Sequence, residues 1–121
     1  MADRDIIVWG EIPVTDLEKS VAFYSKVFGY EMTIDTSGPN PMADLGGTQN
    51  LAGGHLYPGK PAPDGGNTIH LGLPDSLEAG IARCKEAGGE VVSDPIPLPT
   101  GRFVYARDID GNSIGLYEPA A

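Results

Sequence analysis

The sequence predicts an α+β fold made of two copies of a strand-helix-strand-strand-strand unit. Three observations lead to it: short strand-like segments lie between turn residues, two amphipathic helix patterns each follow a capping motif, and the two halves repeat at an offset of 60 residues. We expect the first unit to span about residues 6–58 and the second about 67–119. Residues 59–66, rich in Pro and Gly, are expected to link them within a single domain of 121 residues.

The first unit begins with the apolar, strand-like segment Ile6–Val14. Thr15 and Glu18 follow it with the spacing of a capping box, in which a hydroxyl stands three residues before a carboxylate. Gly29 is placed to cap the C-terminus of the helix. Between these ends, apolar residues recur at helical spacings: Leu17, Val21, Tyr24 and Phe28. Three more strands are expected, over Tyr30–Thr36, Ala43–Leu45 and Asn50–Tyr57.

The second unit restarts the pattern with a strand expected over Thr68–Leu73. Asp75 takes the capping position of a second capping box that is completed by Glu78. The helical face continues through Leu77, Ile81 and Cys84, and Gly88-Gly89 is expected to end the helix. The remaining strands are expected over Glu90–Ser93, Arg102–Arg107 and Ser113–Glu118, with a hairpin turn at Asp110-Gly111-Asn112.

The repeat rests on identical residues at matching positions. Adding 60 to Leu17, Glu18, Ala22 and Gly29 gives Leu77, Glu78, Ala82 and Gly89, and Leu56-Tyr57 matches Leu116-Tyr117. Because helix, cap and final strand repeat in one register, the two units are expected to superpose. The alternative is a chain with two ordinary capped helices and no structural repeat.

Composition excludes several kinds of partner. The net charge of −9 and the pI near 4.4 disfavour binding to nucleic acid, because an acidic surface repels phosphates. No apolar run approaches the roughly 20 residues that cross a bilayer, and the charged N-terminus is unlike a signal peptide. The only cysteine, Cys84, cannot form an internal disulfide. These features favour a cytoplasmic protein without nucleic-acid or membrane partners.

Three segments carry a family resemblance. Ile12–Tyr24 (IPVTDLEKSVAFY) resembles the opening of glyoxalase-like proteins, Val27–Tyr30 (VFGY) the usual end of their first helix, and Asp108–Ile114 (DIDGNSI) their closing segment. The chain thus resembles the vicinal oxygen chelate superfamily, which includes glyoxalases, bleomycin-resistance proteins and extradiol dioxygenases. The resemblance covers nearly the whole chain and is closest to single-domain proteins described as related to lactoylglutathione lyase.

The resemblance implies two βαβββ modules whose curved, mostly antiparallel sheets surround a cavity, and a homodimer that covers the exposed edges. It does not imply one reaction, so function has to be argued from the site. Metal-dependent relatives use four strand positions, which correspond here to Trp9, His55, Thr68 and Gly115. Only His55 is a good metal donor, so no metal cofactor is expected at these positions.

Residues two positions further along the strands share the same face. Glu11 and His70 are equivalent in the two units, and we expect both to face the cavity as candidate catalytic residues. If they approach each other, they form a candidate acid/base pair; the alternative is a hydrogen bond that only closes the cavity floor. Tyr57 and Tyr117 follow His55 and Gly115 in the same way. The predicted ligand-binding wall therefore comprises Trp9, Glu11, His55, Tyr57, Thr68, His70, Gly115 and Tyr117.

Each of these side chains also has a structural interpretation. Trp9 can fill core volume, a single histidine is often structural, and the tyrosines can pack at an interface. Tyr24 and Cys84 are expected in the core, and no cationic neighbour marks Cys84 as a nucleophile. Arg102 and Arg107 fit surface salt bridges better than an anion site.

Three functional hypotheses follow. The first is a metal-free protein that binds a small, partly aromatic molecule. The second is a lyase, isomerase or dioxygenase that uses either a displaced metal site at Glu11, His55 and His70 or Glu11 as a general base. The third is a homodimeric structural module without a small ligand.

Overall fold

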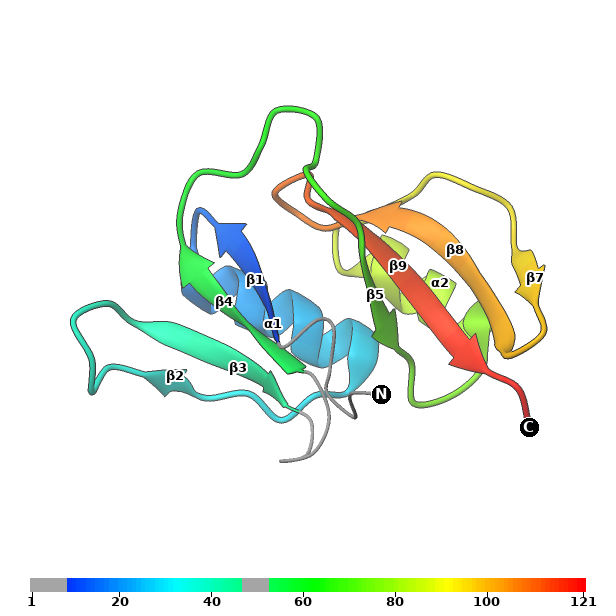
Figure 1. Cartoon of the computed structure of the whole chain (residues 1–121), viewed down its shortest axis with the longest axis horizontal. Coiled ribbons are helices and arrows are strands. Elements are labelled where there is room, and N and C mark those ends of the chain that lie inside the picture. The colour runs from blue at the N-terminus through cyan, green and yellow to red at the C-terminus, as the bar shows by residue number, and fades with distance from the viewer. Residues whose placement is uncertain (1–8, 47–52) are drawn as a thin grey trace, which may run out of the picture.

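Two sheets lie side by side in the computed structural model, which describes residues 9–46 and 53–121 (Figure 1). The first half contains β1 (Trp9–Val14), α1 (Leu17–Phe28), β2 (Ile34–Asp35), β3 (Met42–Gly46) and β4 (Gly53–Pro58). The second half contains β5 (Ile69–Gly72), α2 (Leu77–Glu86), β6 (Glu90–Val91), β7 (Ile96–Leu98), β8 (Gly101–Arg107) and β9 (Ser113–Pro119).

The strand orders confirm the predicted fold class and the repeat. The first sheet has the order β1-β4-β3-β2 and the second has the equivalent order β5-β9-β8-β6. In each sheet the first and last strands pair in parallel, β1 with β4 and β5 with β9, and the other pairs are antiparallel. α1 packs against β3 and β4, α2 packs against the second sheet, and the helices also contact each other. Figure 1 shows both helices behind the sheets.

Two strand predictions need correction. β7 was not predicted because its sequence, Ile96-Pro97-Leu98, contains a proline, which has no N–H to donate to a neighbouring strand. The strand pairs with β8 alone and is not part of the order β5-β9-β8-β6. The strand expected over Tyr30–Thr36 is reduced to the two residues of β2. Residues 6–8 and 50–52 of the predicted strands lie outside the described residues.

The caps also differ from the prediction by one residue. Asp16, not Thr15, is the N-cap of α1, and its side chain accepts a hydrogen bond from the backbone N–H of Lys19 at 3.1 Å. The Thr15 hydroxyl instead donates to Asp110 Oδ1, 2.5 Å away in the second half. As predicted, Gly29 ends the helix in a left-handed conformation with φ 73°.

In α2 the N-cap is Ser76, whose hydroxyl accepts from the backbone N–H of Ala79 at 3.2 Å. Asp75, the predicted cap, instead accepts two hydrogen bonds from Arg83, at 2.7 and 2.8 Å. Each helix is thus preceded by two residues that can act as the N-cap. In each case the residue expected as the cap bonds a more distant partner instead: Thr15 bonds Asp110, and Asp75 bonds Arg83.

The core lies between the helices and the covered faces of the sheets. Tyr24 and Cys84 are fully buried, as predicted. Burial, followed by the charge of Asp108, raises the pKa of the Cys84 thiol to about 11. The thiol is therefore neutral at physiological pH, which agrees with a structural role.

A buried polar cluster joins the two halves. Asp108, only 4% exposed, accepts hydrogen bonds from the Tyr24 hydroxyl at 2.6 Å and from the backbone N–H groups of Asp110 and Asn112, both at 2.9 Å. Asn112 Nδ2 donates to Asp108 at 3.0 Å and to the carbonyl oxygen of Pro13 at 2.8 Å. The turn between β8 and β9 is thus bound to α1 and β1 of the first half.

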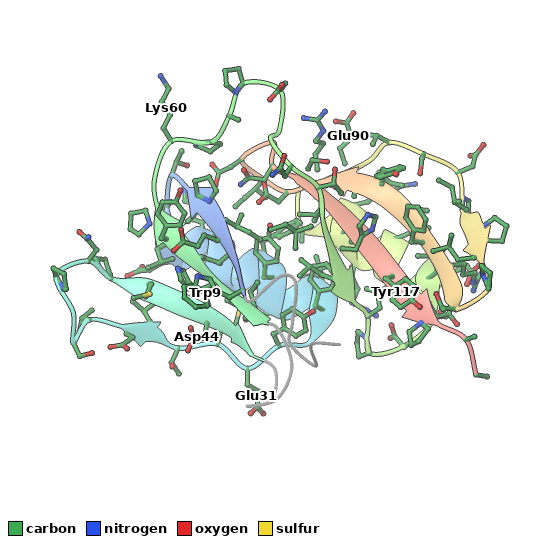
Figure 2. All side chains as sticks on the ribbon, viewed as in Figure 1. Trp9, Glu31, Asp44, Lys60, Glu90 and Tyr117 are labelled. Atoms are coloured by element: carbon green, nitrogen blue, oxygen red, sulfur yellow. The ribbon has the colours of Figure 1, made fainter. Side chains whose placement is uncertain are left out.

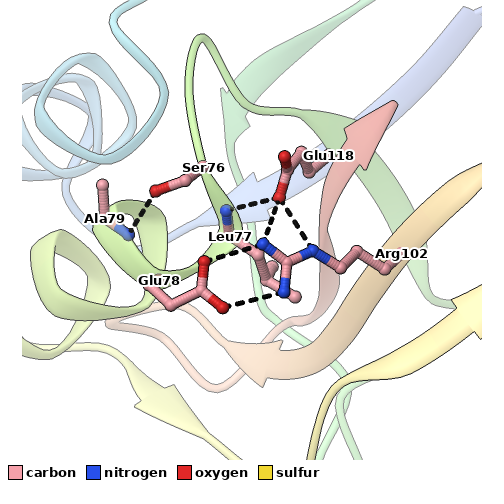
Figure 3. A network of polar contacts seen from close by, with 6 residues as sticks. All are labelled: Ser76, Leu77, Glu78, Ala79, Arg102 and Glu118. Carbon is pink, nitrogen blue, oxygen red and sulfur yellow. Dashed lines mark hydrogen bonds and ion pairs between the residues drawn. The ribbon is translucent and has the colours of Figure 1, made fainter. Parts of the chain in front are cut away.

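A second polar network fixes the start of α2 (Figure 3). Arg102 donates to both oxygens of Glu78, at 2.7 and 2.8 Å, and to Glu118 at 2.9 Å. Glu118 also accepts from the backbone N–H of Leu77 at 2.8 Å, one of the groups that a helix N-terminus leaves without a partner. The expected salt-bridge role of Arg102 is confirmed. The same expectation for Arg107 is wrong among the described residues, because its guanidinium donates to the Gly111 carbonyl oxygen instead.

We predict that Arg102→Ala lowers the melting temperature at neutral pH and that the deficit narrows in acid. Hydrogen bonds from Arg102, then a backbone hydrogen bond, hold the pKa of Glu78 below its ordinary value of 4.5. A lowered carboxyl pKa contributes stability above the ordinary value, and this stability is lost as the pH falls through the folded-state pKa. Thermal unfolding of the wild type and of Arg102→Ala, from neutral pH to below the ordinary Glu78 pKa of 4.5, tests the prediction. A difference in melting temperature that stays constant on acidification would contradict it.

Candidate functional site

Each sheet has one face covered by its helix and one open face. On the first sheet the open face carries Trp9, Glu11, His55 and Tyr57, because these positions alternate with the buried Ile12 and Leu56. Trp9 is 61% exposed, so it does not fill core volume. Figure 2 places Trp9 on the first sheet and Tyr117 on the second.

Glu11 and His55 form a pair on this face. The parallel register of β1 and β4 sets them opposite each other, and His55 Nε2 lies 2.9 Å from Glu11 Oε2. The Glu11 side chain is 55% exposed and that of His55 17%. The His55 ring also packs edge-to-face against Tyr57, with 6.5 Å between ring centroids. The carboxylate therefore orients the imidazole and remains accessible to solvent.

On the second sheet the open face is aromatic. His70 packs edge-to-face on Phe103 with centroids 4.9 Å apart, and Phe103 packs edge-to-face on Tyr105 at 5.1 Å. Tyr117 lies opposite Phe103 in the β8–β9 register, and its hydroxyl donates to the Thr100 carbonyl oxygen at 2.8 Å. Phe103 is buried, whereas His70 and Tyr105 are exposed.

Two pockets lie where the halves meet. One, of about 870 Å³, is bounded by the end of α1 and by residues of β1, β3, β4 and β5, and includes Tyr30, Thr68 and His70 in its wall. The other, of about 540 Å³, lies between β1 and the segment that precedes β5, and includes Trp9, Glu11 and Thr68. Thr68 lines both, and its hydroxyl is 2.5 Å from that of Ser113.

Glu11 and His70, which were expected to face one cavity, line different pockets and do not pair within one chain. Glu11 contacts His55 of its own sheet, whereas His70 contacts Phe103 and Tyr105. The reason is the topology: β1 pairs with β4 and β5 pairs with β9, so equivalent residues belong to separate sheets. The single cavity wall expected from the sequence is therefore divided between two open faces and two pockets.

The four positions that bind metal in metal-dependent relatives carry few metal-donor side chains here. Trp9 and Gly115 offer no donor, the Thr68 hydroxyl is bonded to Ser113, and His55 is bonded to Glu11. The displaced set of Glu11, His55 and His70 is also not assembled within one chain. Within residues 9–46 and 53–121, no group of three or more His, Cys, Asp or Glu side chains is arranged to hold a metal.

The site prediction lacks Phe103 and Tyr105 because β8, which carries them, holds none of the four expected metal positions. The sequence did contain the signal, since Phe103 and Tyr105 alternate along a predicted strand and must share a face.

No helix in the described part of the chain is long and apolar enough to cross a membrane.

Comparisons with known proteins agree with this architecture. Residues 6–116 match the family model described as the Glyoxalase/Bleomycin resistance protein/Dioxygenase superfamily. A glyoxylase-like domain-containing protein from Didymella fabae is 29% identical over 112 residues, 85% of each chain. "Putative glyoxylase CFP32" from Mycobacterium bovis is 29% identical over 119 residues; the match covers 94% of this chain but only 44% of that protein.

Two solved structures extend the comparison. TnmS3, an antibiotic binding protein from Streptomyces sp. CB03234, is 28% identical with a TM-score of 0.70, and the match covers 99% of this chain and 100% of that one. A glyoxalase/bleomycin resistance protein from Albidiferax ferrireducens T118 has a TM-score of 0.72 over 96% of this chain and 100% of its own. At 19% identity, that second likeness concerns the fold alone.

Proposed function

Because the chain belongs to the glyoxalase/bleomycin resistance protein/dioxygenase superfamily, we propose that it binds a small, partly aromatic molecule without the metal ion that metal-dependent relatives use. One observation carries the proposal: of the four positions concerned, only His55 has a good metal-binding side chain, since Trp9 and Gly115 offer no donor and the Thr68 hydroxyl is bonded to Ser113. The aromatic open face of the second sheet and the two pockets supply apolar surface with a few polar groups, as ligand sites do. The similarity to TnmS3, an antibiotic binding protein, supports a binding role.

Metal analysis tests the metal-free part of the proposal. Protein purified without an affinity tag or chelator is expected to contain far less than one equivalent of Zn, Ni, Mn or Fe after dialysis. The same preparation is then screened by thermal shift against aromatic small molecules, and stabilising hits are expected. A stoichiometric metal that survives dialysis and is lost in His55→Ala would contradict the proposal.

A second candidate is an enzyme in which Glu11 acts as a general base. The observation in its favour is the Glu11–His55 pair beside the 540 Å³ pocket, since a carboxylate paired with imidazole can accept a proton from a bound molecule. Incubating each hit with the protein and following its conversion by mass spectrometry separates the two candidates. Turnover that Glu11→Gln abolishes, while the variant still binds the hit, would favour the enzyme.

We also propose that the protein is a cytoplasmic homodimer. The open face of the first sheet exposes two large apolar side chains, Trp9 at 61% and Met42 at 37%, and a second copy could cover them. Light scattering at micromolar concentration is expected to give twice the chain mass of 12.7 kDa. A mass of one chain at that concentration would contradict the dimer and leave the metal-free binding proposal standing.

A further inference from the structure

We propose that His70, Phe103 and Tyr105 form an aromatic platform that stacks against the flat ring system of a planar aromatic ligand, and that Gly115 determines this specificity. The inference rests on the proposed binding function and names the part of the ligand that the second sheet recognises. Hereafter "the platform" means these three side chains on the open face of β5 and β8.

The rings of the platform hold one another in place. Phe103 is 7% exposed and packs against both of the other rings, at 90° to His70 and 89° to Tyr105. His70 and Tyr105 are 5.8 Å apart and tilted by 57°, and both are exposed to solvent. Edge-to-face packing on a buried ring fixes the two exposed rings. Because they are tilted by 57°, a planar ligand can stack on His70 and meet Tyr105 at an angle, and the fixed rings lose little rotamer entropy on binding.

Gly115 is what allows His70 to join the platform. The register places Gly115 between His70 on β5 and Tyr105 on β8, directly across both strand pairs. A Cβ atom at position 115 would lie 2.7 Å from Cε1 and 2.8 Å from Cγ of His70, which no real contact tolerates. The imidazole therefore crosses β9 over the glycine and reaches Phe103. At this position metal-dependent relatives carry a ligand, so the space is used here for an aromatic ring instead.

The chemistry of this row indicates the class of ligand. The cross-strand row His70, Gly115 and Tyr105 and the neighbouring pair Phe103 and Tyr117 include no Asp, Glu, Lys or Arg. Ring faces without formal charges favour flat, apolar ring systems over charged or saturated ones. His70 also lines the 870 Å³ pocket, so a ligand stacked on the platform has room for a substituent that enters it.

The test compares two probes that differ only in aromaticity: naphthol, which is planar, and its saturated counterpart decahydronaphthol. Binding is followed through the ring signals of the two histidines of the sequence, His55 and His70, by NMR of the full chain. Naphthol is expected to shift the His70 signals upfield and to bind more tightly than decahydronaphthol by about three- to tenfold. His55, on the other sheet, is expected to shift less.

Gly115→Ala is the decisive variant, and Gly38→Ala is its matched control because a Cβ at position 38 meets no atom within 4 Å. Since the His70 ring is exposed, it can swing away from the new methyl group without unfolding the sheet. The variant is expected to move the His70 signals in the absence of probe, to leave those of His55 in place, and to weaken naphthol binding by about three- to tenfold. Gly38→Ala is expected to match the wild type in all three respects. If Gly115→Ala fails to fold, His70→Ala replaces it in the binding measurement, with the same expected loss.

Several results would overturn the platform while leaving the proposed function intact: equal affinity for both probes, shifts centred on His55, or screening hits without naphthol binding. Isotope-filtered contacts between the His70 ring and an unlabelled second copy would make the platform a dimer contact instead. If neither the naphthol titration nor the wider screen gives binding, the proposed function fails together with the platform.

Discussion

Replacing Asp108 with alanine is expected to lower the free energy of unfolding by about 3–5 kcal/mol. The carboxylate accepts from the Tyr24 hydroxyl, from two backbone N–H groups and from Asn112 Nδ2. Alanine would leave several buried donors without a partner, at a cost of about 1–3 kcal/mol each, partly offset where water can enter. Because Asn112 also binds Pro13, the loss is expected to loosen the connection between the two halves.

Chemical denaturation of Asp108→Ala and Tyr24→Phe measures this effect. Burial, then the charge of Asp108, raises the pKa of Tyr24 well above 10, so its hydroxyl remains a donor at neutral pH. Tyr24→Phe removes only that donor and is expected to cost roughly 1–2 kcal/mol. Equal losses in the two variants would show that Asp108 does not hold the turn between β8 and β9.

Replacing Phe28 with alanine is expected to cost about 3–5 kcal/mol and to weaken ligand binding as well. Phe28 is 2% exposed and stacks between Tyr24, with ring centroids 5.9 Å apart, and Tyr30, at 5.3 Å. Tyr30 lines the 870 Å³ pocket, and its hydroxyl donates to the Gly72 carbonyl oxygen of β5 at 3.1 Å. A cavity behind Tyr30 would therefore remove core packing and free part of the pocket wall.

Denaturation gives the stability loss, and titration of a screening hit gives the change in affinity. Phe28→Leu fills much of the cavity and is expected to recover more than half of both losses. A stability loss with unchanged affinity would show that the ligand does not use the pocket beside Tyr30. A loss below about 1 kcal/mol would show that the site relaxes around the smaller side chain.

The fold could be predicted because its signals are local and repeated. The stripe of Leu17, Val21, Tyr24 and Phe28 defines α1, and its repetition at an offset of 60 predicts a second unit with the same topology. β7 was not predicted because Pro97 lacks the N–H that a strand in the middle of a sheet needs for hydrogen bonding. The caps were misassigned by one residue because Thr15 and Asp16 are both good capping residues, and Asp110, far away in sequence, decides between them.

The site could be predicted only in part, because the repeat gives equivalence but not proximity. Glu11 and His70 occupy equivalent positions, yet each pairs within its own sheet, and that pairing brings Glu11 to His55. The sequence could not predict that Gly115 leaves room for the His70 ring, because only the three-dimensional packing shows that the ring lies over this glycine. The sequence did predict which residues lie on the strands of the site. It did not predict which of them meet.

The most direct test of metal-free binding is isothermal titration of the best screening hit into chelator-dialysed protein, repeated with one added equivalent of Zn²⁺ or Ni²⁺. Because only His55 among the four positions is a good metal-binding side chain, the dissociation constant is expected to agree within about twofold in the three titrations. Binding that appears only with metal, or tightens by about tenfold or more with metal and loses this gain in His55→Ala, would contradict the account.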